Sequence, residues 1–394
     1  MKPCPEPLKR LGLPLPAITP RVALQQVHHG RKTTKSWLPP SLQPFLAIAI
    51  ALGLAFLALY RFPPDSLPCG LIDVNHEGAR VPSLLAQLHD PVRWDLSYDF
   101  CWAQRGMTMA LRWRMLIPVV CRDLGISDSQ YLWVPWVGNL ALLVAVAYYS
   151  WRSARDPSRL TVAVGLFVTS SAWTNAVWGI GCMDAWYLLA LLLFSFSPST
   201  TVALAACLFG PWVDERFLLA LPLCAVLRGC DRRSDWLRNL WPALGVLPYC
   251  AIRLIAHFTG DPTVDDQFQL QGGVFWRFAA WLPIGWWHGW RMGWVVIVPA
   301  LVAVWNTRPA FAGILARWAM AAGFACLLMI YFLAWDSSRS IAVMLPWIVL
   351  GVSRTRLPAW ALWLLVALNF YLPAAYVTAA AAVGSPISPV MAIH

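Results

Sequence analysis

The chain has 394 residues, of which 59% are hydrophobic and only 12% are charged. Soluble domains carry about 25% charged residues, so the composition excludes an ordinary soluble domain and predicts an all-α polytopic membrane protein with about 10–12 transmembrane helices. The net charge of +11 does not indicate nucleic-acid binding, because the Lys and Arg residues are scattered over short loops, as the positive-inside rule places them.

The N-terminal residues 1–42 are basic and rich in Pro, which predicts a disordered cytoplasmic tail. The apolar run 44–60 is expected to be an uncleaved first span, with the N-terminus cytoplasmic in a bacterial inner membrane. Residues 62–129 are then an outer loop with interfacial helices, in which a disulfide among Cys69, Cys101 and Cys121 stays open. The membrane domain is expected over 43–381, followed by a short outer tail at 382–394.

The remaining spans follow from apolar runs that alternate with basic loops. Three of these runs are short, at about 17 Å of helix, so they must be locally extended, re-entrant or in thinned bilayer: 185–196, 201–211 and 217–228. A Trp-rich piece, 276–290, is expected to be an interfacial helix. The other expected spans are 131–150, 160–176, 240–257, 292–305, 310–333, 340–352 and 359–380.

Three consecutive ionisable residues, Asp214, Glu215 and Arg216, separate two of the short apolar runs. Each would cost roughly 2.5–3.5 kcal/mol at a bilayer centre, whereas a central Leu or Phe returns only about 0.3–0.6 kcal/mol. The triplet is therefore expected at a membrane surface or in a watery cleft, and the basic loops place it outside. A functional role and a structural ion pair are both open for Asp214 and Arg216.

The outer loop also contains a basic, apolar stretch at 107–120. Arg105 and Arg112 are seven residues apart and so share one helical face, which is typical of a helix that lies along the membrane surface. Its arginines are either interface anchors that snorkel to headgroups or a site for a lipid phosphate, which Arg binds bidentately.

Three motifs together resemble the GT-C superfamily of membrane glycosyltransferases. The first outer loop bears Asp73 and Glu77 and is followed by an Arg-hydrophobic-Leu-x-Pro box at 114–118. The acidic–basic triplet precedes a span that contains Pro222, and a late Asp336-x-x-Arg339 precedes one that contains Pro346. The resemblance covers residues 44–352.

The resemblance implies transfer of a sugar from a polyprenyl-phosphate donor to an acceptor at the outer membrane face. Asp73 is then the first candidate for the catalytic base and Glu77 the second, although the loop reads D-V-N-H-E without an adjacent acid pair. His76 beside them is expected to be solvated. The implied substrate-binding residues are Arg112, Arg114, Asp214, Glu215, Arg216, Asp336 and Arg339. Of these, Asp214, Arg216, Asp336 and Arg339 are expected to line one outward cavity with Asp73.

Two other functions stay open: a transporter or flippase, and a non-catalytic subunit of a membrane assembly. Transporters place ionisable residues near the bilayer midplane, often on broken helices. Here the span centres are nearly free of charge, apart from Arg253 and Arg317 nearer helix ends, which favours the enzyme. The ten Cys include no C-x-x-C pair, so no metal motif is present, and the need for a divalent ion stays open.

Overall fold

The structure is a computed structural model that describes Pro39 and residues 42–61, 85, 87–89, 114–178, 183–231, 239–259, 282–306, 310–333, 340–372, 375–377 and 387–389. By its contacts the chain divides into two units, Met1–Pro44 and Phe45–His394. In the first unit the described residues are Pro39 and 42–44, where the amide of Leu42 donates to the carbonyl of Pro39 at 3.0 Å. The second unit contains the packed helices.

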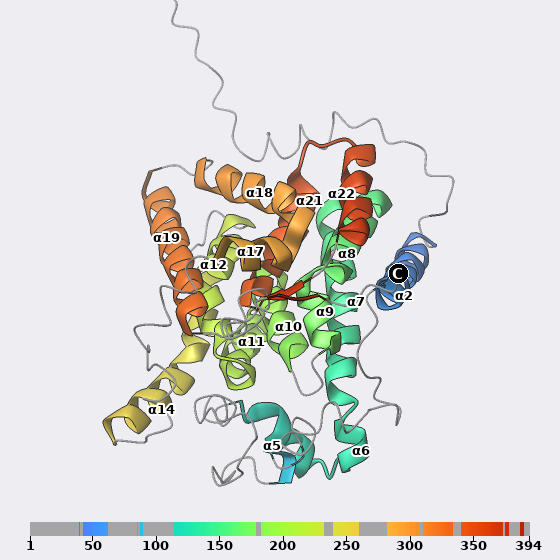
Figure 1. Cartoon of the computed structure of the whole chain (residues 1–394). Coiled ribbons are helices and arrows are strands. Elements are labelled where there is room, and N and C mark those ends of the chain that lie inside the picture. The colour runs from blue at the N-terminus through green and yellow to red at the C-terminus, as the bar shows by residue number, and fades with distance from the viewer. Residues whose placement is uncertain are drawn as a thin grey trace, which may run out of the picture. The chain divides into compact units, whose positions relative to one another are not determined.

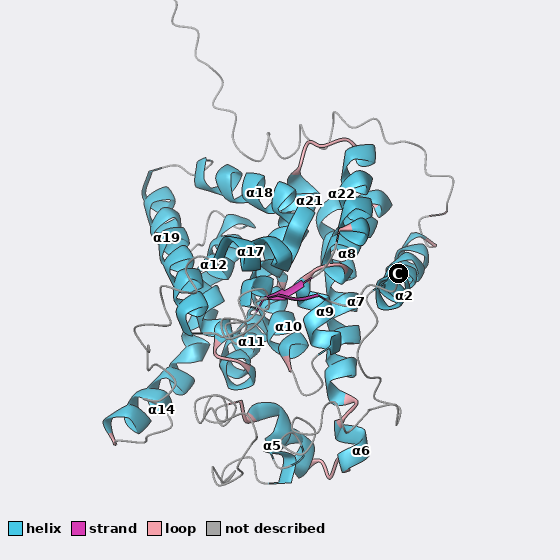
Figure 2. Ribbon diagram, viewed as in Figure 1, coloured by secondary structure: helices cyan, strands magenta, loops and turns pink. Residues whose placement is uncertain are grey.

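Helices form nearly all of the described chain, which confirms the predicted all-α class (Figure 2). Figure 1 labels the α-helices. In chain order, with the short 3-10 helices included, the described helices are α2 (Gln43–Arg61), α5 (Leu116–Asp123), α6 (Asp128–Tyr131), α7 (Val134–Ala154), α8 (Pro157–Val168), α9 (Ser171–Trp178), α10 (Asp184–Phe196), α11 (Thr200–Val213), α12 (Arg216–Asp231), η2 (Trp241–Val246), α14 (Leu247–Phe258), α17 (Leu282–Trp290), η4 (Arg291–Gly293), α18 (Trp294–Asn306), α19 (Ala310–Leu333), η5 (Ile341–Met344), α21 (Leu345–Arg354) and α22 (Ala359–Tyr371). The exception is a small antiparallel pair, β1 (Ala375–Val377) with β2 (Ile387–Pro389).

Three helical segments in the described chain are long and apolar enough to cross a membrane: Asp128–Ala154, Trp241–Phe258 and Pro283–Asn306. Shorter apolar helices of 10–17 residues accompany them: Phe45–Arg61, Pro157–Val168, Asp184–Phe196, Thr200–Val213, Ala316–Leu328, Ile341–Arg354 and Ala359–Tyr371. These features are those of a membrane protein. How many of the shorter helices cross the bilayer stays a prediction.

The helix limits agree with the expected spans at most positions and differ at three. The expected span 160–176 is divided, because α8 ends at Val168 and α9 begins at Ser171. The expected interfacial helix 276–290 and span 292–305 form one apolar segment, Pro283–Asn306, interrupted by η4. The last expected span, 359–380, ends early, since α22 stops at Tyr371 and β1 comes next.

Local signals in the sequence explain several of these limits. The Asp156 side chain accepts from the amide of Ser158 at 3.0 Å and Pro157 occupies the first turn, so α8 begins there. Ser199 caps α11 in the same way through the amide of Val202. Arg155 ends α7 in the left-handed conformation, with φ of 48°, a position that Gly or Asn usually fills.

The helices α7, α10 and α12 begin at one end of the packed helices, here named the acidic end after Asp184, Asp214 and Glu215. The indole of Trp186, on the first turn of α10, donates to the carbonyl of Val134 at the start of α7, at 3.1 Å. The start of α12 meets the start of α10 through an ion pair between Arg216 and Asp184. Helix α11 ends at Val213 and α12 begins at Arg216, so the triplet Asp214–Arg216 separates two helices, as the sequence predicts.

The opposite end is named the basic end after two buried arginines, Arg159 and Arg228. Arg228 donates to the carbonyls of Phe194, Ser197 and Asn239 at 2.8, 2.9 and 2.7 Å. Arg159 donates to those of Val352, Ser353 and Thr355 at 2.7, 2.9 and 2.9 Å. Because the last carbonyls of a helix lack partners within it, each arginine closes a helix C-terminus that would otherwise be unsatisfied.

The acidic end and the basic end are predicted to face opposite sides of the membrane. In a chain whose native cysteines are replaced, Cys at Ser129 should react with an impermeant thiol reagent on intact cells, and Cys at Ser153 should not. Both positions are exposed, and Ser153 lies beside Arg152 and Arg155, which the positive-inside rule keeps cytoplasmic. Labelling of Ser153→Cys alone would reverse the orientation.

Candidate functional site

The described chain contains four of the nine residues that the sequence predicts for the site: Arg114, Asp214, Glu215 and Arg216. All four lie together at the acidic end, joined by ion pairs. The other five, Asp73, Glu77, Arg112, Asp336 and Arg339, lie outside the described residues. The prediction that Asp73, Asp336 and Arg339 share a cavity with this cluster therefore stays a prediction.

Arg216 is the buried centre of the cluster. Its Nε donates to Asp214 Oδ1 at 2.8 Å, and its Nη2 donates to Asp214 Oδ2 at 2.6 Å, which makes a bidentate pair. The same Nη2 donates to Asp184 Oδ1 at 2.8 Å. Side-chain exposure is only 6% for Arg216, 2% for Asp214 and 5% for Asp184, so this ion triad is sealed from solvent.

The α11–α12 turn holds Asp214 and Arg216 in position to pair. Asp214 adopts an extended backbone, which ends α11, and its Oδ1 accepts from the amide of Arg216 at 2.9 Å. Asp214 thereby satisfies an amide at the start of α12 that has no helical partner. Gly210 allows the turn to close, because a Cβ there would lie 2.5 Å from the buried ring of Phe217.

Asp184 is the member of the cluster that was not among the expected site residues. It is the first residue of α10 and is separated by 32 positions from Arg216. The sequence signal was an acidic residue that directly precedes an apolar run. Its partner could not be read from the sequence, because the pairing depends on how α10 packs against α12.

An aromatic ring completes the surroundings of the triad. The guanidinium carbon of Arg216 lies 5.2 Å from the ring centroid of Tyr187, one turn along α10 from Asp184. A guanidinium over an aromatic face is attracted by the ring quadrupole, more strongly where water is excluded. Tyr187 therefore covers the cation on a side where the two carboxylates do not reach.

Arg114 connects the segment before α5 to this turn. It lies two residues before the start of α5, and its Nη1 lies 3.1 Å from Asp214 Oδ2. Its Nη2 and Nε donate to the two carboxylate oxygens of Glu215 at 2.8 and 3.2 Å. The side-chain amide of Gln87 donates to the carbonyl of Arg114 at 3.2 Å. The segment that leads into α5 is thus fastened to the α11–α12 turn at this point.

The charges around Arg114 favour its cationic form. Burial lowers the pKa of the Arg114 guanidinium, but the carboxylates of Asp214 and Glu215 raise it by more, so its pKa lies above the ordinary value. Arg114 and Glu215 are more accessible than the triad, with 18% and 31% of their side chains exposed. The cluster therefore has a sealed half around Arg216 and a more open half around Arg114.

The five side chains of the cluster carry a net charge of −1, since three carboxylates face two guanidinium groups. Glu215 occupies the Nε–Nη2 edge of the Arg114 guanidinium and Asp214 lies beside Nη1, so a phosphate that binds this edge bidentately would have to displace Glu215. Among the described residues no group of three or more His, Cys, Asp or Glu side chains could hold a metal ion. The chemistry that this cluster offers is exchange of one anion for another.

Comparison of the chain with protein-family models, with curated proteins and with solved structures gives no match.

The sealed triad predicts a large loss of stability when its cation is removed. Arg216→Met removes the cation that the buried carboxylates of Asp184 and Asp214 share, although Asp214 keeps its contact with Arg114, and this loss should lower the free energy of unfolding by about 3–5 kcal/mol. The matched control is Arg122→Met, because Arg122 pairs only with its neighbour Asp123 at an exposed site, and such pairs contribute about 0–1 kcal/mol. Denaturant unfolding of the purified proteins measures both, and equal stability of the two variants would contradict a stabilising triad.

Because ion pairs hold Arg114 to the α11–α12 turn, its loss should free the segment that contains α5 without unfolding the other helices. In Arg114→Met, amide hydrogen exchange should increase across α5 (Leu116–Asp123) and remain unchanged in α10 and α12. Asp123→Asn is the control, since Asp123 lies on α5 but pairs only with Arg122. Unchanged exchange in α5 would mean that Arg114 does not anchor the loop.

Proposed function

We propose that the chain is a GT-C-like membrane glycosyltransferase, which moves a sugar from a polyprenyl-phosphate donor to an acceptor at the outer face of a bacterial inner membrane. The N-terminus is then cytoplasmic and the acidic end faces outward. The observation that carries the proposal is the contact of Arg114 with Asp214 and Glu215. Two of the three motifs that resemble the superfamily, 100 residues apart in the chain, thereby meet in space.

The third motif is supported by the position of the residue next to it in the chain. Ser340 comes directly after Arg339 and is 3% exposed. It opens the segment η5, which packs against α10 and α12, the helices that begin with Asp184 and Arg216. The residue that follows the third motif therefore belongs to a segment packed on these helices, while Asp336 and Arg339 themselves lie outside the described residues.

Glu215 is the carboxylate that a donor phosphate would replace. A phosphate and a carboxylate both accept two parallel hydrogen bonds from a guanidinium, and Glu215 is the most exposed of the three acids. Exchange of Glu215 for phosphate would leave Arg114 bound to Asp214 and to the lipid headgroup. The positive charge of Arg114 then stabilises the phosphate as it leaves the sugar.

The base that activates the acceptor hydroxyl is assigned to the first outer loop. Asp184 and Asp214 are unsuited to accept a proton, because both are buried and bound to the Arg216 cation, which favours their ionised form. In the proposed mechanism Asp73 takes the proton, with Glu77 as the second candidate, and no cofactor is assigned.

The test uses the purified chain in nanodiscs with a polyprenyl-phosphate sugar. Glu215→Gln should bind polyprenyl phosphate about tenfold more tightly, because a neutral amide competes less for Arg114 than a carboxylate does. Arg114→Met should weaken binding by a similar factor. Asp128→Asn, an exposed acid that pairs with His89 on the same loop, should leave binding unchanged.

Transfer itself is measured with a labelled sugar on the donor and membranes that supply the acceptor. The wild type should move the label and Asp73→Asn should not, while still binding polyprenyl phosphate. Absence of donor binding by the wild type would overturn the proposal.

A specific observation keeps the transporter or flippase as the second candidate. Arg291 is 1% exposed and lies within the apolar segment Pro283–Asn306, where η4 interrupts the helix and Arg291 has a φ of 46°. A buried charge at a break in a span is typical of transporters. Movement of the lipid-linked sugar across vesicles without transfer of the sugar would favour this candidate.

A further inference from the structure

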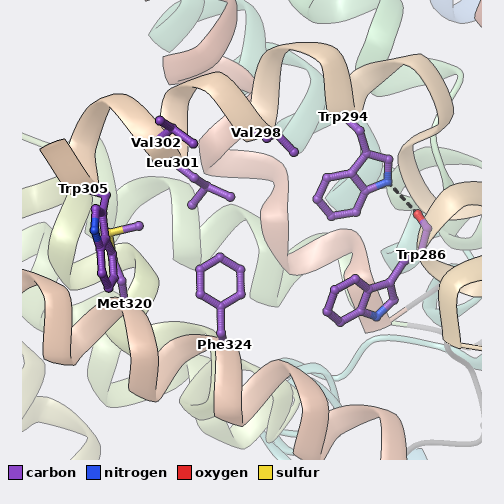
Figure 3. A pocket seen from close by; sticks show the side chains of 8 residues that line it. All are labelled: Trp286, Trp294, Val298, Leu301, Val302, Trp305, Met320 and Phe324. Carbon is purple, nitrogen blue, oxygen red and sulfur yellow. Dashed lines mark hydrogen bonds between the residues drawn. The ribbon is translucent and has the colours of Figure 1, made fainter. Parts of the chain in front are cut away.

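An apolar pocket lies between α18 and α19, away from the charged cluster. Its volume is about 430 Å³, and the atoms that it exposes are apolar. The indole of Trp294 is satisfied by the carbonyl of Trp286 at 2.8 Å, as the dashed line in Figure 3 shows. The lining residues are Trp286, Trp294, Val298, Leu301, Val302, Trp305, Met320 and Phe324.

The pocket exists because two consecutive helices pack on different neighbours. Helix α18 packs mainly against α21, where Gly351 lies directly against the backbone of Val296. Helix α19 packs along α12, where Gly323 admits the side chain of Leu223. The space that separates α18 from α19 is therefore fixed by both packing contacts rather than closed by the two helices themselves.

The pocket opens at the surface of the helices rather than being enclosed by them. If it stayed empty, its lining would lose the dispersion contacts that a filled site makes. Water is a poor occupant, because a buried water needs two to four polar partners and this lining exposes none. The occupant must therefore be apolar.

The position of the pocket gives it access to the bilayer. Its wall includes Val298, Val302 and Trp305, with 49%, 52% and 41% of their surface exposed. These residues belong to Pro283–Asn306, a segment long and apolar enough to cross a membrane. In a membrane, exposed apolar residues of such a segment face hydrocarbon chains.

The lining of the pocket has a defined length. The lining residues of α18 run from Trp294 to Trp305 at helical spacing, which is about 16.5 Å along the helix axis. A volume of about 430 Å³ over that length suits a narrow, flexible chain better than a second helix, which is about 10–12 Å across with its side chains.

The length of the lining also distinguishes between a phospholipid acyl chain and a polyprenyl chain as the occupant. One leaflet contributes about half of the 30 Å hydrocarbon core, close to the length of the lining. A phospholipid acyl chain has this length, whereas the chain of a polyprenyl carrier is several times longer. We infer that the α18–α19 pocket binds one acyl chain of a bilayer phospholipid, which acts as a packing element between the two helices.

The test measures stabilisation of the delipidated full-length chain by added dioleoyl phosphatidylcholine. Phospholipid should raise the midpoint of thermal unfolding of the wild type. Val298→Phe, which places a ring in the pocket, should reduce that shift to less than half. Val295→Phe is the matched control, because Val295 lies one turn away on α18, is similarly exposed at 42% and does not line the pocket; it should keep the full shift.

A second measurement covers the case in which Val298→Phe fails to fold. In nanodiscs of phosphatidylcholine brominated on its acyl chains, Trp fluorescence should be quenched less in Trp294→Phe than in Trp347→Phe, because Trp347 is fully buried on α21 outside the pocket and beyond the reach of lipid. The quenching is compared as the part lost from the wild-type signal.

Equal phospholipid shifts in the Val298→Phe and Val295→Phe proteins would overturn the inference. Equal contributions of Trp294 and the buried Trp347 to the quenching would do the same. Stabilisation by polyprenyl phosphate that excess phosphatidylcholine does not displace would assign the pocket to the carrier lipid instead.

Discussion

The guanidinium of Arg216 is the group on which the acidic end depends. It is buried between Asp214 on its own turn and Asp184 on α10, so it fixes how far α12 can slide along α10. Removing one member of such a buried set leaves an uncompensated charge, which destabilises more than the intact set stabilises. The same ion pairs hold the α11–α12 turn in place. Asp214 of this turn also pairs with Arg114, and so the segment before α5 attaches to it.

The lengths of α10, α11 and α12 explain why both of their ends are so fully paired. They have 13, 14 and 16 residues, about 20, 21 and 24 Å of helix, against a hydrocarbon core of about 30 Å. If these helices cross the bilayer, the charges at their two ends fall within the depth of an ordinary hydrocarbon core. There the protein must supply the partners that water supplies elsewhere: carboxylates for Arg216 and helix carbonyls for Arg228.

Much of the helix arrangement can be predicted from the sequence because charged residues bound the apolar runs. The expected span 310–333 coincides with α19, and Asp214 to Arg216 were expected to separate two helices. The partners of Arg216 and Arg114 could not be predicted in the same way, since each pairing depends on tertiary packing across 32 or 101 positions. The division at Thr169 and Ser170 was also missed, because a hydropathy pattern reads residue type and does not record where the backbone leaves the helix. In the structure both hydroxyls bond to carbonyls of the preceding turn.

The division of the cluster into two halves bears on the alternatives that the sequence left open for Asp214 and Arg216. A group that exchanges partners during a reaction has to be reached by the substrate, and 2% and 6% side-chain exposure for these two residues do not allow it. Their geometry favours the structural ion pair. Glu215 and Arg114, more exposed and bound to each other through both carboxylate oxygens, are the pair that can open. Any reaction at this end would therefore use the Arg216 triad as a rigid support and the Arg114–Glu215 pair as the site of exchange.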